Sequence, residues 1–115
     1  MEKLQKSNSI CKLAGKFFTM PQFLILAKDY TDANALQRRL SVRETHLKRM
    51  RVEKAEGRFI VGGAKLDKEG NMHGSMLVVQ LENEDAVKRW INEDPYITGK
   101  VWEHVEILPF KIAEV

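Results

Sequence analysis

The residue best suited to proton transfer in this sequence is His46, which lies three positions after Arg43 in a strongly polar segment. A histidine can act as a general base or acid near neutral pH when a carboxylate sets its charge and tautomer. If this segment is helical, Arg43 and His46 share one face, and the guanidinium could bind an anionic substrate beside the imidazole. Spacing alone favours the plainer interpretation, a solvated histidine on the surface of a helix.

Two further polar residues could complete such a site, although each also has an ordinary structural explanation. Asp94 stands directly before Pro95, where its carboxylate could orient a histidine across space or simply help the chain to turn. Ser75 follows Gly74 at the head of an apolar run. Its hydroxyl could donate to a ligand, but no G-x-S-x-G elbow surrounds it that would make it a nucleophile.

Several familiar catalytic and cofactor motifs are absent from the sequence. It contains no C-x-x-C, H-E-x-x-H, Walker or G-x-G-x-x-G pattern. His73 and His104 have no Cys, Asp or Glu at a recognised ligand spacing. We therefore expect neither a tightly bound metal ion nor a cofactor.

Strand and helix signals alternate along the chain in an informative order. Apolar, β-favouring runs bounded by turn residues predict strands at residues 22–28, 58–64, 72–81 and 101–110. A helix of about five turns should begin near Asp32 or Asn34 and end near Glu56. The apolar residues at helical spacing, which would face the core, are Leu36, Leu40, Leu47 and Met50. Asn83 should cap a second helix that stops at Asp94 and Pro95.

The order strand, helix, strand, strand, helix, strand predicts an α+β, ferredoxin-like fold. In that fold a four-stranded antiparallel sheet carries both helices on one face. The other sheet face would expose apolar side chains unless something covers it, so we expect a homodimer. Trp90, Tyr96 and Trp102 should serve core or dimer packing rather than base stacking.

Composition and charge narrow the classes of partner. The chain has 115 residues, of which 43% are hydrophobic and 30% are charged, as expected for one globular domain. Residues 1–20 carry the whole net charge of +3, while residues 21–115 hold equal numbers of basic and acidic residues. The domain therefore lacks the clustered basic excess of a nucleic-acid binder. No apolar run approaches the roughly 20 residues that span a bilayer, so we expect no membrane partner.

The first 20 residues form a basic leader, and residues 21–115 form the domain. The leader's apolar residues have helical spacing, and its lysines and serines have some character of a mitochondrial transit peptide, although arginine is absent. A disordered tail is the alternative. The single Cys11 cannot form an internal disulfide, which favours a reducing compartment. The location is thus predicted to be cytoplasmic or mitochondrial.

Most of residues 22–112 resemble YCII-related proteins. The stretches that carry the resemblance are FLILAKDYTDANALQRRLSVRETHL, GGAKLDKEGNMHGSMLVVQLENEDAVKRWINEDPY and VWEHVEILPFK. The motifs R-x-x-H, G-S, D-P-Y and P-F-K follow one another in the order of that family. The leader is a departure from the family.

The resemblance implies a dimeric α+β barrel of ferredoxin-like subunits, with a cavity between sheet and helices. It also implies a His–Asp dyad, carried by His46 and Asp94, with Ser75 near the cavity. It supplies no reaction, since most relatives have no assigned activity. Related folds and some members act on aromatic or lactone catabolites by isomerisation, dehalogenation or oxygenation, which is an analogy at the level of the fold.

These observations support an enzyme that performs metal-free acid–base chemistry, of lyase, isomerase or dehalogenase type, on a small anionic or aromatic metabolite. His46 would move the proton, Asp94 would hold its tautomer, and Arg43 or Ser75 would bind substrate. The alternative is a non-catalytic module that binds a small molecule or serves as an accessory subunit through the same cavity. RNA binding through the sheet is remote because the strands lack an aromatic-rich pattern.

Overall fold

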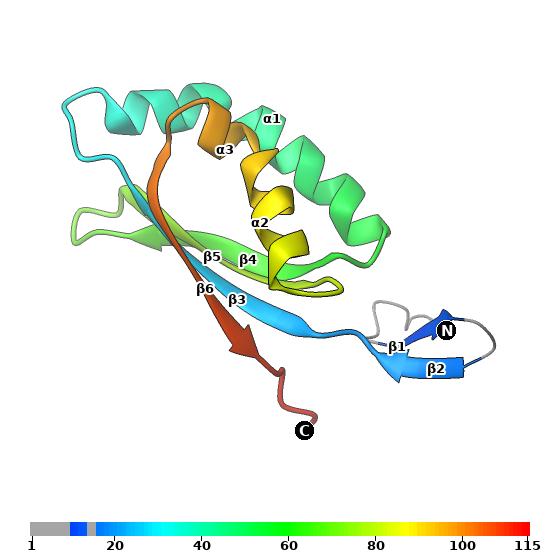
Figure 1. Ribbon diagram of the computed structural model, residues 1–115. Helices are drawn as coiled ribbons and strands as arrows, with labels where there is room; N and C mark the ends of the chain where they lie inside the picture. Colours follow the sequence, from blue (N-terminus) through cyan, green and yellow to red (C-terminus); the bar gives the residue numbers. More distant parts are fainter. Residues whose placement is uncertain (1–9, 14–15) are drawn as a thin grey trace.

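The computed structural model describes residues 10–13 and 16–115 (Figure 1). Its elements, in chain order, are β1 (Ile10–Leu13), β2 (Lys16–Thr19), β3 (Gln22–Asp29), α1 (Ala35–Ala55), β4 (Phe59–Leu66), β5 (Met72–Gln80), α2 (Glu84–Asn92), α3 (Pro95–Thr98) and β6 (Trp102–Phe110). The strands and helices predicted for the domain are all present, with shifts of a few residues at their ends. No helix in this described part is long and apolar enough to cross a membrane.

Strands β3 to β6 form one antiparallel sheet in the order β4-β5-β3-β6. Figure 1 shows α1, α2 and α3 together on one face of this sheet. The strand of this sheet that comes first in the chain is β3. It lies in the interior of the sheet and pairs with both β5 and β6, as the split β-α-β connection of a ferredoxin-like fold requires. The predicted α+β, ferredoxin-like fold is confirmed.

The core lies between the helices and the sheet. Alternate residues of β3, which are Phe23, Ile25 and Ala27, are buried on the helix side, as the period of two in a strand dictates. They meet buried residues of β5 and α2, which include Leu77, Val79, Val87, Trp90 and Ile91. The predicted packing role of the two tryptophans is confirmed, since Trp90 and Trp102 both belong to this core.

The opposite sheet face carries a band of apolar side chains with no helix over it. Leu24 of β3 pairs across the strands with Val78 of β5 and Leu108 of β6, and Leu26 pairs with Met76. Val61 of β4 and Phe110 of β6 extend the band and are 51% and 41% exposed. We call this set, Leu24, Leu26, Val61, Met76, Val78, Leu108 and Phe110, the open face.

The prediction for the buried face of α1 is wrong in part. Leu40 is 49% exposed, whereas Arg39, His46 and Glu53 are buried. The sheet side of the helix is therefore largely polar. These buried side chains are stabilised by partners across the fold. Arg39 pairs with a β3 carboxylate, and Glu53 accepts from Arg58 and Trp90.

In the leader, residues 10–13 and 16–19 form an antiparallel hairpin separate from the four-stranded sheet. The helix suggested by the apolar spacing is therefore not what these residues adopt. The targeting and disorder alternatives concern residues 1–20, of which residues 1–9 and 14–15 lie outside the described residues.

Candidate active site

His46 and Asp94, 48 positions apart in sequence, are in direct contact. His46 projects from the middle of α1, and Asp94 caps the N-terminus of the one-turn helix α3. The His46 Nδ1 atom lies 2.8 Å from Asp94 Oδ1, and both side chains are buried. The pairing that the family resemblance implied is present, and the solvated-histidine interpretation is wrong.

The hydrogen bonds of Asp94 fix the direction of this contact. Oδ1 also accepts from the Tyr96 backbone N–H at 2.8 Å, and Oδ2 accepts from Arg49 Nη1 at 2.8 Å. A carboxyl group that receives a guanidinium and a backbone donor is an ionised acceptor. Nδ1 of His46 must therefore carry the hydrogen and donate a hydrogen bond to Asp94 Oδ1. In the neutral imidazole, Nε2 then holds the free lone pair.

The imidazole of His46 contacts two aromatic rings, which also contact each other. It stacks on Tyr96 with ring centroids 3.9 Å apart and an interplanar angle of 11°, and it meets Trp102 edge-on at 5.8 Å. Burial raises the pKa of the Tyr96 phenol above its ordinary value of 10, although Arg39 and Arg43 act in the opposite direction. At neutral pH the phenol therefore keeps its proton and remains a hydrogen-bond donor.

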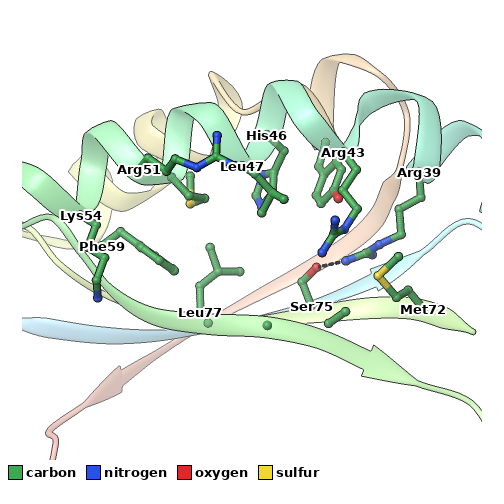
Figure 2. Close-up of a pocket in the computed structure, with 15 residues that line it drawn as sticks. Arg39, Arg43, His46, Leu47, Arg51, Lys54, Phe59, Met72, Ser75 and Leu77 are labelled. Atoms are coloured by element: carbon green, nitrogen blue, oxygen red, sulfur yellow. Dashed lines mark hydrogen bonds between the residues drawn. The ribbon is translucent and has the colours of Figure 1, made fainter. Parts of the chain in front are cut away.

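A cavity of about 280 Å³ lies between α1 and strands β4 and β5. Arg43, His46, Ser75 and Tyr96 all line it, whereas Asp94 lies behind the histidine. Figure 2 shows His46 on the helix side of this space, opposite the strand that carries Ser75 and Leu77. Within the described chain Nε2 has no hydrogen-bond partner, so its lone pair is available to a molecule in the cavity.

Ser75 is held at the sheet side of the cavity by a buried polar network. Its Oγ atom accepts from Arg39 Nη2 at 2.9 Å and from Trp102 Nε1 at 3.1 Å. Arg39 Nη1 in turn donates to both carboxylate oxygens of Asp29 at 2.9 Å. The charge of Arg39 is thus neutralised inside the fold, and its guanidinium acts mainly to fix Ser75.

The sequence-predicted site residues therefore divide into two kinds. His46, Ser75 and Arg43 face one cavity, and Asp94 supports the histidine from behind. Arg43 forms no hydrogen bond or ion pair with any residue that the structure describes, and its side chain points into the cavity in Figure 2. It is the cation of this cluster that is available to a ligand.

Sequence reasoning did not identify Arg39 and Arg49 as members of the site. Arg49 binds Asp94 and also donates to the Trp90 carbonyl at 2.7 Å, so it anchors the dyad to α2. A signal was present, because Arg39 and Arg49 lie seven and three positions from His46 and so share its side of α1. Their carboxylate partners, however, are distant in sequence.

In the part of the chain that the structure describes, no group of three or more His, Cys, Asp or Glu side chains is arranged to hold a metal ion.

Comparisons with known sequences agree with this architecture. Residues 22–111 match the model of the YCII-related domain. Protein YciI of Escherichia coli O6:H1 is 35% identical over 95 residues, covering 77% of this chain and 95% of that protein. An uncharacterized protein of Haemophilus influenzae is 37% identical over 95 residues with the same coverage.

A solved structure extends the comparison. It is the 5-chloro-2-hydroxyhydroquinone dehydrochlorinase of Burkholderia phenoliruptrix AC1100 in complex with 2,5-dihydroxybenzoquinone. The two structures superpose with a TM-score of 0.68 and 27% sequence identity, over 80% of this chain and 95% of the other. The fold thus carries a small-molecule reaction in that protein.

Proposed function

Because the chain belongs to the YCII-related family, we propose that it is an enzyme whose His46 transfers a proton to or from a small molecule in the cavity. Asp94 holds the imidazole in the tautomer that leaves Nε2 as the base. The observation that carries this proposal is the buried 2.8 Å contact between Nδ1 and Asp94, with the other side of the ring against the cavity.

The reaction class follows from the base, because among the described residues His46 forms no hydrogen bond with a hydroxyl or thiol that could act as a nucleophile. Nε2 takes a proton from a substrate O–H or C–H bond. The electron pair left behind either expels a leaving group or shifts to another atom, which then receives the proton back from the imidazolium. The first course is a lyase or dehalogenase reaction, and the second is an isomerisation. The imidazolium formed is stabilised by the Asp94 carboxylate, and no step requires a metal ion or cofactor.

Arg43 and Ser75 bind the substrate in this proposal. Both line the cavity with His46, and both offer hydrogen-bond donors there, which suits a carbonyl, phenolate or carboxylate oxygen. The dehydrochlorinase from Burkholderia supports a hydroxylated aromatic compound as a first substrate class, since its name and bound ligand are of that type.

The test is turnover of chlorinated and unchlorinated hydroquinones and hydroxybenzoates by the wild type and by His46→Ala. Loss of the base should lower kcat by about 10²- to 10⁴-fold. His73→Ala is the matched control, because His73 is exposed and does not line the cavity. Equal rates for His46→Ala and the wild type would exclude His46 as the base.

A second variant, Asp94→Asn, tests the tautomer. The oxygen that faces Nδ1 also accepts from the Tyr96 amide, so an NH₂ group at that position would place the imidazole proton on Nε2 instead and would also remove the cap of α3. We expect kcat to fall by about 10²-fold or more, and the ¹⁵N shifts of His46 to report the reversed tautomer. A compound that binds but is never converted would favour the alternative of a non-catalytic binding module.

We further propose that two copies pair through the open face. The face is a continuous apolar band on a sheet whose other side is already covered, and such a band is usually an interface.

For the location, the curated relatives are bacterial, which favours the cytoplasmic alternative over the mitochondrial one.

A further inference from the structure

We propose that the cavity selects a ligand with two anionic groups, one at each end of an apolar body. This inference specifies the substrate class of the proposed enzyme and rests on the same cavity. Four cationic side chains, Arg39, Arg43, Arg51 and Lys54, line the cavity, and no Asp or Glu does. Arg39 and Arg51 are paired with Asp29 and Glu44, whereas Arg43 and Lys54 have no carboxylate partner among the described residues. Two such cations favour anions, because ionised hydrogen-bond pairs are stronger than neutral ones.

The cations lie at two separate ends. Arg43 and Lys54 are eleven residues apart on α1, which is three turns of helix and a rise of about 16 Å on the same face. Figure 2 shows Arg43 beside Ser75 at one end of the cavity and Lys54 beside Phe59 at the other. One small anionic group cannot contact both.

The end at Arg43 consists of donors. Arg43 has no carboxylate partner among the described residues. The Ser75 hydroxyl oxygen already accepts two N–H groups, from Arg39 and Trp102. Both lone pairs of Ser75 Oγ are therefore occupied, and its single hydrogen is left to donate. A ligand group placed here must accept hydrogen bonds, as a carboxylate does.

The end at Lys54 also has donors to spare. Lys54 Nζ donates to the Ile60 carbonyl at 2.9 Å, which uses one of its three N–H bonds and holds the ammonium near β4. Arg51 lies nearby but is paired with Glu44 at 3.2 Å, so its charge is largely offset. Lys54 has no ion pair within the described chain and is the free cation of this end.

The middle of the cavity is apolar. Leu47 and Met50 of α1 face Phe59 and Leu77 of the sheet, and Gly62 keeps the strand backbone open to this space. The lining therefore matches a dicarboxylate with a hydrocarbon or aromatic spacer. His46 lies between the two ends on α1, where a proton on such a spacer or on a substituent of it would be within its reach.

Equilibrium binding tests the inference without requiring turnover. The probes are suberate and terephthalate, with octanoate and benzoate as the monoanions of matching size, titrated by calorimetry into the full chain. We expect each dicarboxylate to bind about tenfold or more tightly than its monocarboxylate, as one additional charged hydrogen bond implies. Arg43→Gln and Lys54→Gln should each abolish that preference.

Lys48→Gln is the control, because it removes the same charge from α1 at an exposed position outside the cavity. It should keep the preference. Equal affinity for mono- and dicarboxylates, equal loss in Lys48→Gln, or no saturable binding by either dicarboxylate would overturn the inference. A preference that persists in an inactive His46→Ala protein would uphold the ligand class even if the catalytic proposal failed.

Discussion

Glu53 is a buried carboxylate outside the cavity whose protonation should affect folding. Arg58 Nε donates to it at 2.6 Å, and Trp90 Nε1 donates to the same oxygen at 2.6 Å. The hydrogen bond from Arg58 lowers the pKa of Glu53 below its ordinary value of 4.5, although burial acts against it. The carboxylate therefore links the end of α1 to α2 in its charged form.

A lowered pKa in the folded state means that this contribution is present near neutral pH and is lost as pH falls through the folded-state value. Glu53→Gln should therefore lower the free energy of unfolding by about 1.5 kcal/mol near neutral pH, as expected for one charge-assisted hydrogen bond. The difference from wild type should shrink as the pH falls below the ordinary pKa of 4.5. Urea denaturation at neutral pH and at a series of acidic pH values measures it, with the exposed Glu103→Gln as control. A difference that is constant with pH would contradict this assignment.

The residue types of the site could be singled out from the sequence, but their pairing could not. His46, Ser75, Asp94 and Arg43 stood out by type and neighbours, yet each had an ordinary structural explanation of equal or greater weight. Only the family resemblance joined His46 to Asp94. The Arg39–Asp29 ion pair could not be predicted from the local sequence, because two residues that meet across the core have no characteristic spacing along the chain.

At the scale of elements, the end of α1 is set by Gly57. Its φ is +82°, and it donates to the Lys54 carbonyl at 3.1 Å, while Arg58 N–H reaches the Glu53 carbonyl at 2.9 Å. These two bonds form a Schellman motif, which requires a left-handed residue. A Cβ at Gly57 would meet no atom within 4 Å, so any cost of adding one is conformational and not steric.

Gly57→Ala should therefore destabilise the fold by about 1 kcal/mol. The left-handed conformation costs an alanine about 1–2 kcal/mol, and the stiffer unfolded chain returns part of it. Gly63→Ala is the matched control, because Gly63 is not in that conformation and also has free space. Thermal melts compare the two. Equal melting temperatures would mean that α1 can end without this motif.

Most elements could be predicted, and the errors have physical causes. Turn residues and apolar periodicity placed the four strands of the domain and both long helices. The exposed Leu40 was assigned to the core from the periodicity of the apolar residues. That periodicity alone cannot show that the buried face of a helix is polar, with its charges paired to residues of other elements. Helix α3 was predicted only as a turn, although Asp94 at its cap and Pro95 in its first turn are a known helix start.

At the scale of the whole molecule, the open face predicts association. Leu24 lies at the centre of that face, paired with both Val78 and Leu108. A charge there would be buried without a partner in a dimer, so Leu24→Glu should convert dimer to monomer. Light scattering after size-exclusion chromatography measures the mass. Val52→Glu, on the 55% exposed outer side of α1, should leave the dimer intact.

A wild-type mass of one chain at working concentrations would contradict the dimer directly.

The overall topology itself could be predicted, since the order of strands and helices leaves few right-handed ways to connect them. The family resemblance implied a cavity between sheet and helices, but the charges that line this cavity could not be predicted. Those charges depend on which side of α1 faces the sheet. The apolar periodicity of α1 is too weak to predict that side.

Asp94 is at once the partner of the imidazole and the cap of a helix, and this has a consequence for how the site can be observed. The same oxygen receives His46 Nδ1 and the Tyr96 amide. That amide proton should exchange with solvent deuterium only when α3 opens, and the opening also separates Asp94 from the histidine. The exchange rate of a single backbone proton thus measures how often the His46–Asp94 pair comes apart, in a protein with no substrate present.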